Sequence, residues 1–291
     1  MSSENIYKQT GSIPSSENYP IRYDLYTPSG NSRDYLPVIL FLHGFKGFKD
    51  WGPFPDACED LSRAGFAVVA MNFSLNGVGE DPVSFDRLDL FERETLSQDL
   101  KDVGTVIEAV INGDISSGRV HLDSDHIGII GHSRGGHTAV AAAAEYSEIQ
   151  CLVTWSAVAN YREHWSREMV EDWKTKGYTE ILNSRTGQIM RVDREVYEDA
   201  EENAEKVIAL NRVRELHIPS LFIAGNADET VPDRQTRLLY RNCPSEIKEL
   251  RLIPDAGHTF GASHPFEEDE FPEKFVEVLE LTESWFLENL A

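Results

Sequence analysis

Short, nearly continuous apolar runs are the feature of this 291-residue sequence that most limits how it can fold. Such runs are typical of strands buried on both faces, which is the pattern of a parallel sheet. They lie at residues 38–42, 66–71, 127–130, 151–155, 221–224 and 250–253. A further segment, 21–26, alternates apolar and polar residues in the way expected of an edge strand.

Helical patterns separate these runs. Apolar residues recur at spacings of three and four along 96–110, which predicts one buried helix face. Residues 137–146 are rich in alanine, the best helix former, and residues 274–290 are amphipathic. Strands that alternate with helices predict right-handed crossovers, and therefore an α/β fold with a mostly parallel central sheet and helices on both faces.

One stretch, 156–215, interrupts this alternation and contains no buried strand run. A structureless loop of that length would be unusual, so we expect a small cap inserted into the sheet domain. Within it, residues 179–196 predict a hairpin that turns at 186–187, and residues 194–210 predict a helix.

The charge balance limits the partners. The chain has 27 basic and 50 acidic residues, a formal net charge of −23. Nucleic acid and anionic membrane surfaces both demand a basic footprint, so we expect neither as a partner. No apolar run approaches the roughly 18 residues of a membrane span.

The chain length, together with the strand and helix patterns above, predicts a single α/β domain over 1–291. Residues 1–20 are polar and lack the features of a secretory signal, so we expect a loose N-terminal arm and a cytoplasmic location. The three cysteines, Cys58, Cys151 and Cys243, are far apart and form no CxxC pair. This usage is typical of a reducing compartment and indicates neither a disulfide framework nor a zinc site.

The sharpest motif is GHSRG at 131–135, between an apolar run and the alanine-rich helix. A GxSxG sequence in a strand–turn–helix context is typical of a nucleophile elbow. The glycines permit a sharp turn where the backbones crowd. Ser133 would then lie at a helix N-terminus, where amides and the helix dipole favour an anion. The alternative is a glycine-rich loop with a surface serine.

A nucleophilic serine needs a general base and an acid that orients the base. Asp228 and His258 follow the last two apolar runs, at the strand ends where open α/β sheets place their sites. The order Ser133, Asp228, His258 is the order of α/β-hydrolases. The alternatives left open are Glu229 or Asp233 for the acid and His264 for the base.

Two backbone N–H groups should face the developing negative charge. One belongs to Arg134, the residue after the nucleophile. The other should come from the HGFKGF loop at 43–48, where Phe45 is our candidate because Gly44 lets the loop turn tightly. The alternative is that His43 and Gly44 only shape this turn.

Four segments together resemble an α/β-hydrolase: HGF at 43–45, GHSRG at 131–135, GNADETVP at 225–232 and DAGHTF at 255–260. Within that superfamily the chain is most similar to dienelactone hydrolase and prolyl-oligopeptidase-like serine esterases. Its cap resembles the insertion of cinnamoyl (feruloyl) esterases. It departs from dienelactone hydrolases proper, which have cysteine at the nucleophile, and it lacks the HGGG loop of hormone-sensitive-lipase-like esterases.

The resemblance implies a serine carboxylesterase that acts on small or aryl esters through an acyl-enzyme, without a cofactor or a metal. The same machinery serves peptidases, thioesterases and acyltransferases, and a non-catalytic small-molecule-binding member is a further alternative. The expected partner is a small-molecule ester, and a homodimer is left open.

Five further residues complete the expected substrate contacts. His43 and His132 adjoin the HGF loop and the nucleophile. Trp155, Trp165 and Trp173 cluster around the start of the cap, where we expect them to line an acyl or aryl pocket. Packing of the cap's own core explains the tryptophans equally well.

Overall fold

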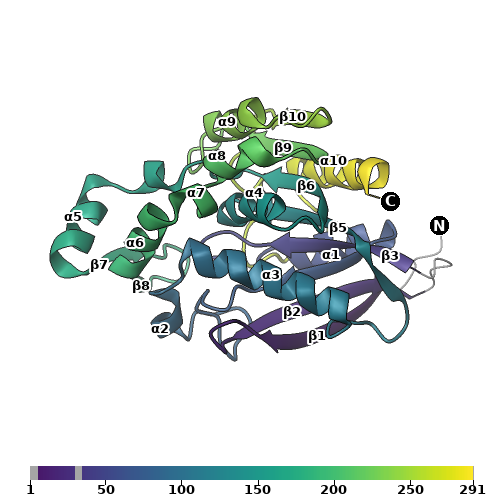
Figure 1. Cartoon of the computed structure of the whole chain (residues 1–291), viewed down its shortest axis with the longest axis horizontal. Helices are drawn as coiled ribbons and strands as arrows, with labels where there is room; N and C mark the ends of the chain where they lie inside the picture. The colour runs from purple at the N-terminus through teal and green to yellow at the C-terminus, as the bar shows by residue number, and fades with distance from the viewer. Residues whose placement is uncertain (1–5, 30–34, 291) are drawn as a thin grey trace.

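A computed structural model describes residues 6–29 and 35–290 and contains an eight-stranded sheet (Figure 1). Across the sheet the order is β1-β2-β4-β3-β5-β6-β9-β10. β1 and β2 run antiparallel to their neighbours, and all other pairs are parallel. The strands are β1 (Ile6–Pro14), β2 (Pro20–Pro28), β3 (Tyr35–Leu42), β4 (Ala67–Met71), β5 (His121–His132), β6 (Ile149–Trp155), β9 (Ser220–Gly225) and β10 (Lys248–Ile253).

Helices cover both faces of the sheet, which confirms the predicted α/β fold. Alternate side chains of β3 point to opposite faces: Leu40 belongs to one apolar core and Phe41 to the other. α1 (Phe54–Arg63) and α10 (Glu273–Asn289) pack on the Phe41 side. The helices on the Leu40 side are α3 (Leu96–Asn112), α4 (Arg134–Glu145) and α9 (Arg234–Asn242).

The predicted apolar runs coincide with strands, apart from Phe66, which lies one residue before β4, but two expectations about the N-terminal region are wrong. Residues 6–14, expected to lie in the loose arm 1–20, form β1, which pairs with β2 along nine residues. Consequently β2 is not an edge strand, because β1 covers its free side. β1 is polar and only half-buried, so it carries no apolar run that could reveal it. Residues 1–5 lie outside the described part of the chain.

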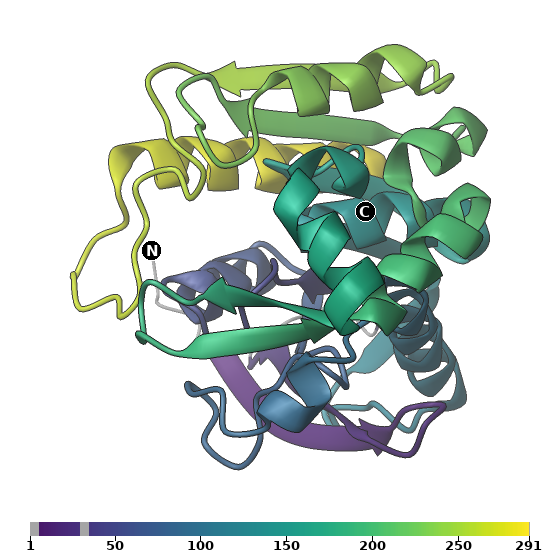
Figure 2. The ribbon, with the colours of Figure 1, turned by 90° about the vertical axis from the view of Figure 1, so that its left-hand side faces the viewer.

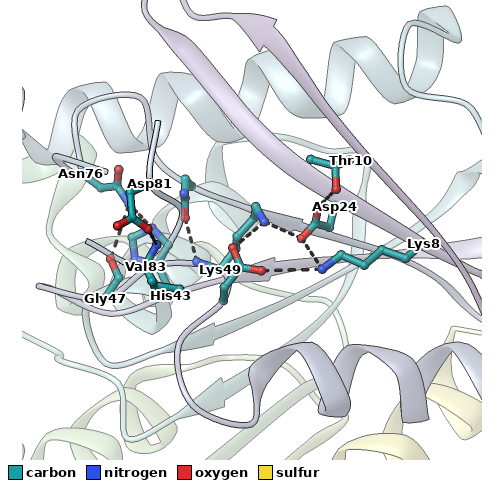
Figure 3. A network of polar contacts seen from close by, with 11 residues as sticks. Lys8, Thr10, Asp24, His43, Gly47, Lys49, Asn76, Asp81 and Val83 are labelled. Atoms are coloured by element: carbon teal, nitrogen blue, oxygen red, sulfur yellow. Dashed lines mark hydrogen bonds and ion pairs between the residues drawn. The ribbon is translucent and has the colours of Figure 1, made fainter. Parts of the chain in front are cut away.

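A polar network attaches β1 to the interior (Figure 3). The buried carboxylate of Asp24 on β2 accepts hydrogen bonds from Thr10 at 2.6 Å and from Lys49 at 2.5 Å, and it pairs with Lys8 at 3.0 Å. Lys49 also contacts Asp50 at 2.6 Å. Burial opposes ionisation, yet the contacts with Lys49 and Thr10 hold the pKa of Asp24 below its usual value. β1 is therefore fixed to the loop that follows β3.

The predicted cap segment 156–215 folds into short helices and one hairpin, which extend from the sheet at the left of Figure 1 and face the viewer in Figure 2. The predicted hairpin is confirmed, with shorter strands than expected. The predicted helix 194–210 breaks into three pieces at Asn203 and Ile208. The elements are η1 (Tyr161–His164), α5 (Arg167–Lys176), β7 (Tyr178–Leu182), β8 (Ile189–Asp193), α6 (Arg194–Glu202), α7 (Ala204–Val207), α8 (Ala209–Arg212) and η2 (Val213–Glu215).

The cap packs on the sheet domain through an aromatic cluster. Trp173 of α5 is fully buried and donates a hydrogen bond to the carbonyl of Val192 at 2.9 Å. It belongs to the same apolar cluster as Phe48 and Phe91, which come from the loop after β3 and from α2 (Leu88–Phe91). Within the described residues, no helix combines the length and apolar character that crossing a bilayer requires.

A buried histidine gives the fold a pH-dependent weakness. His137 of α4 is fully buried, its Nδ1–H donates to the carbonyl of Val158 at 3.0 Å, and burial lowers its pKa to about 4. In the unfolded chain a histidine titrates near pH ~6.5. Between these two pKa values the imidazole of the unfolded chain binds a proton, whereas the buried imidazole of the folded protein stays neutral. The free energy of unfolding therefore decreases as the pH decreases.

We therefore expect the stability advantage of the wild type over His137→Asn to shrink as the pH falls. The gap in free energy of unfolding should close by about 1 kcal/mol per pH unit between pH 6 and 4.5. Urea denaturation of both proteins at several pH values measures this gap. A gap that stays constant over that range would contradict the assignment of a neutral buried imidazole.

Candidate active site

Ser133 lies on a strained turn between β5 and α4. Its φ of 57° and ψ of −116° are unusual for a residue other than glycine. A Cβ on Gly131 would overlap the backbone of Gly135, and a Cβ on Gly135 would overlap the carbonyls of Leu42 and His43. Only glycine therefore fits on either side of the serine. The structure thus places Ser133 on the elbow that the GxSxG sequence predicts.

The structure brings the predicted acid and the predicted base within hydrogen-bonding distance of each other. Asp228 follows β9 and His258 follows β10, and His258 Nδ1–H donates to Asp228 Oδ2 at 2.7 Å. The other carboxylate oxygen accepts the N–H groups of Thr230 and Val231 at 2.9 and 2.8 Å. Burial opposes ionisation of Asp228, but the hydrogen bond and charge interaction with His258 lower its pKa below the usual value.

The other candidates for the acid and the base lie elsewhere. Glu229 is exposed, and Asp233 pairs with Arg237 at 3.0 Å. The alternative base, His264, accepts the N–H of Gly52 at 2.9 Å. The only contacting acid–base pair among these candidates is the one described above.

One cavity, with a volume of about 550 Å³, contains both Ser133 and His258 in its wall. It lies under the cap, and several aromatic side chains line it. Trp51 and Phe54 form part of its sheet-domain side, and Tyr161 and Trp165 form part of its cap side. This size is typical of a site for a small organic molecule.

The HGF loop passes directly beside the nucleophile. A Cβ on Gly44 would lie 3.0 Å from Ser133 Cβ. Phe45 and Arg134 both line the cavity. Arg134 is the first residue of α4, so its N–H has no partner within the helix. The ring of Phe45 stacks on Phe91 with centroids 5.3 Å apart, which fixes the loop.

Our expectation that His43 contacts substrate is wrong. His43 is buried behind the loop, where its Nδ1–H donates to the carbonyl of Gly44 at 2.9 Å. Its Nε2 accepts from Phe73 N–H at 3.4 Å and from Asn76 at 3.3 Å. Figure 3 shows His43 and Asn76 together. Burial lowers the pKa of His43 to about 4, so the ring is neutral near pH 7. His43 therefore shapes the turn, the alternative that the sequence left open.

The tryptophans divide between two environments. Trp155 is fully buried against α10, where its Nε1–H donates to Thr282 at 2.9 Å and its ring packs on Phe41, so its expected substrate contact is wrong. Trp165 and Trp173 do line the cavity. Their rings are 5.1 Å apart and they also form the core of the cap, so the packing interpretation holds for both, and their contact with substrate stays a prediction.

His132 also lines the cavity, as expected. Its Nε2–H donates to the carbonyl of His258 at 3.0 Å, and the two rings are 4.8 Å apart. Burial lowers the pKa of His132 to about 3, so this ring is neutral and positions the His258 loop. Within residues 6–29 and 35–290, no group of three His, Cys, Asp or Glu side chains is arranged to hold a metal.

Sequence reasoning missed several residues of the cavity wall. Tyr161 and His164 come from η1, a short element with no periodic pattern. Lys46 lies inside the HGFKGF loop and Arg185 lies beside the predicted hairpin turn, so both positions were visible in the sequence. What the sequence did not show is that the hairpin folds over this loop.

The Arg134 side chain is buried between two carboxylates. Its guanidinium donates to Asp99 at 2.8 Å and to the carbonyl of Glu94 at 2.9 Å, and the Glu94 carboxylate lies 3.6 Å away. Burial raises the pKa of both carboxyl groups, and the positive charge of Arg134 opposes that shift. The positive charge of Arg134 therefore stabilises the ionised form of both buried carboxyl groups.

These features define a serine-hydrolase-type site on an α/β-hydrolase fold. A model described as the prolyl oligopeptidase family matches residues 59–278, and the chain therefore belongs to the prolyl oligopeptidase family. It is 24% identical over 223 residues to the human (Homo sapiens) acylamino-acid-releasing enzyme. That match covers 75% of this chain but only 28% of the human enzyme.

Two solved structures share the fold over nearly the whole chain. Est1E from Butyrivibrio proteoclasticus, solved with ferulic acid bound, is 20% identical with a TM-score of 0.70, over 96% of this chain and 98% of that one. A dienelactone hydrolase from Anabaena variabilis is 18% identical with a TM-score of 0.63, over 98% and 99%. The resemblance to these families is thus confirmed at the level of the fold.

We expect Arg134→Met to destabilise the protein by about 3–5 kcal/mol, because it leaves two buried carboxylates without a cation. Arg93→Met is the matched control, since Arg93 pairs with Glu195 at 3.5 Å on the surface. Loss of such an exposed pair should cost under about 1 kcal/mol. Urea denaturation measures both, and equal losses would contradict the role given to Arg134.

Proposed function

We propose that the protein is a serine carboxylesterase that hydrolyses small or aryl carboxylic esters through an acyl-enzyme. The observation that carries this proposal is the 2.7 Å hydrogen bond from His258 to Asp228, in a cavity that also contains Ser133 on its strained turn. A nucleophile, a base and an acid that orients the base are the set that acyl transfer needs.

In the first step, Ser133 Oγ attacks the ester carbonyl and His258 Nε2 accepts its proton. The hydrogen bond to Asp228 keeps the proton of neutral His258 on Nδ1, which leaves Nε2 as the acceptor. The Asp228 carboxylate then stabilises the imidazolium that forms. The alcohol departs with a proton from His258, and water releases the acid by the same route.

The oxyanion of each tetrahedral intermediate would bind the N–H groups of Phe45 and Arg134. Their place on the cavity wall and the open N-terminus of α4 support this assignment. No step of this proposed reaction requires a cofactor or a metal, so we propose neither.

The cavity supports a small-molecule ester as the substrate. Aromatic side chains such as Trp51, Tyr161 and Trp165 supply flat apolar surface against which an acyl chain or an aryl ring can pack. For location, the described cysteines are all buried and unpaired, which supports our proposal of a reducing, cytoplasmic environment.

Replacing Ser133 by alanine tests the proposal directly. We expect the purified protein to hydrolyse p-nitrophenyl esters, assayed from acetate to palmitate, together with methyl ferulate. Ser133→Ala should lower kcat by about 10⁴-fold or more on every ester that is turned over. An unchanged rate in this variant would rule out Ser133 as the nucleophile.

If no ester is turned over, labelling with a fluorophosphonate separates the remaining cases. A label on wild type that is absent from Ser133→Ala indicates a serine hydrolase for peptides, thioesters or acyl transfer. The absence of any label would favour the non-catalytic binding protein.

Asp228→Asn should lower kcat by about 10⁴-fold, because the amide favours the wrong histidine tautomer. Asp233→Asn is the matched control, five residues along the same segment and paired with Arg237 instead. We expect it to change kcat less than about twofold. Equal effects of the two substitutions would overturn the assignment of the acid.

A further inference from the structure

Two cations on the cavity wall have no carboxylate partner among the residues that the structure describes. Lys46 comes from the loop after β3, and Arg185 comes from the turn between β7 and β8. Their contacts are with backbone oxygens: Lys46 Nζ donates to the carbonyl of Leu182 at 3.4 Å, and Arg185 donates to the carbonyl of Lys46 at 3.3 Å. Within the described residues, neither lies within 4.0 Å of a carboxylate oxygen.

This arrangement contrasts with the charge of the whole chain. The protein has 50 acidic residues and a net charge of −23, yet the described cavity wall contains no aspartate or glutamate. Its third cation, Arg134, is already neutralised by Asp99 and Glu94. The charge that remains available to a bound molecule is therefore that of Lys46 and Arg185.

The positive charges of Lys46 and Arg185 repel each other. Burial lowers the pKa of both side chains, and the nearby positive charge of Arg185 lowers the pKa of Lys46 further. The negative charge of an anion bound between them would raise the pKa of both side chains and so oppose this lowering.

Two aromatic rings also fix the orientation of the Arg185 guanidinium. It lies over the rings of Phe48 and Phe85, at 5.4 and 5.9 Å from their centroids. A planar guanidinium fixed in this way presents paired N–H donors that match a carboxylate. The ammonium of Lys46 adds a second donor on the same cavity wall, and Lys46 directly follows the proposed oxyanion donor Phe45 in the sequence.

We infer that Lys46 and Arg185 form a specificity site for esters that carry a free carboxylate, such as monoesters of dicarboxylic acids. This inference rests on the proposed esterase activity. Because one cation belongs to the sheet domain and the other to the cap hairpin, a bound carboxylate would also bridge the two parts of the molecule. The hairpin crosses the front of the molecule in Figure 2.

The test compares two esters with the same acyl length, mono(4-nitrophenyl) adipate and 4-nitrophenyl hexanoate. We expect wild type to have a kcat/KM at least about tenfold higher for the adipate, as two charge-assisted hydrogen bonds would provide. Lys46→Asn and Arg185→Gln should each bring this ratio towards one. Asparagine is chosen at position 46 because the backbone there has a φ of 55°, which asparagine tolerates well.

Arg191→Gln is the matched control on the same hairpin. Arg191 is exposed and pairs with Asp193 at 2.6 Å, outside the cavity wall, so the ratio should stay at the wild-type value. A wild-type ratio near one, or a high ratio that survives both Lys46→Asn and Arg185→Gln, would overturn the inference while leaving the esterase proposal intact.

Equilibrium binding separates failure of the inference from failure of the proposed function. Calorimetric titration of Ser133→Ala protein with adipate and with hexanoate needs no turnover. Preferential adipate binding that Arg185→Gln abolishes in the Ser133→Ala background would support the site even if no ester is hydrolysed. Equal binding of both acids would overturn it.

Discussion

The guanidinium group of Arg134 lies where three segments beside the reaction centre meet: the start of α3, the loop after β3 and the start of the cap. It binds Asp99 on α3 and the carbonyl of Glu94, and it lies 5.4 Å from the ring of Phe45 and 5.6 Å from the ring of Tyr161. Arg134 also follows the nucleophile directly. A buried ion group of this kind adds little net stability, because desolvation offsets its attraction. We infer that its main effect is to fix the Phe45 loop and the cap against the elbow.

The parts of the fold that the sequence predicts are those set by local backbone constraints. The elbow could be predicted because the close approach of Gly135 to the carbonyl of Leu42 excludes any side chain there. Asp228 and His258 could be predicted because parallel strands end at one edge of the sheet, so the residues that follow neighbouring strands meet. Neither argument depends on how the remaining side chains pack.

The wrong predictions concern two kinds of strand. One kind is apolar on both faces, and the other is held in place only by its pairing with a neighbouring strand and by polar contacts. Trp155 lies on the same face of β6 as Cys151 and Val153, against α10. Because both faces of β6 are buried, the sequence does not reveal which face turns toward the cap. β1 has no apolar periodicity at all; its order comes from backbone pairing with β2 and from the contact of Lys8 with Asp24.

The net charge of the whole chain also differs from the charge on the cavity wall. A surplus of 23 negative charges describes the surface, where solvent and salt screen a charge beyond about 10 Å. Arg185 lines a cavity whose described wall contains no aspartate or glutamate, so the local charge there is positive although acidic residues outnumber basic ones across the chain. Overall acidity is thus compatible with an anionic substrate, provided that the hairpin brings Arg185 against the loop of Lys46. The cap then serves electrostatics as well as enclosure, since its turn adds a second cation beside Lys46 of the sheet domain.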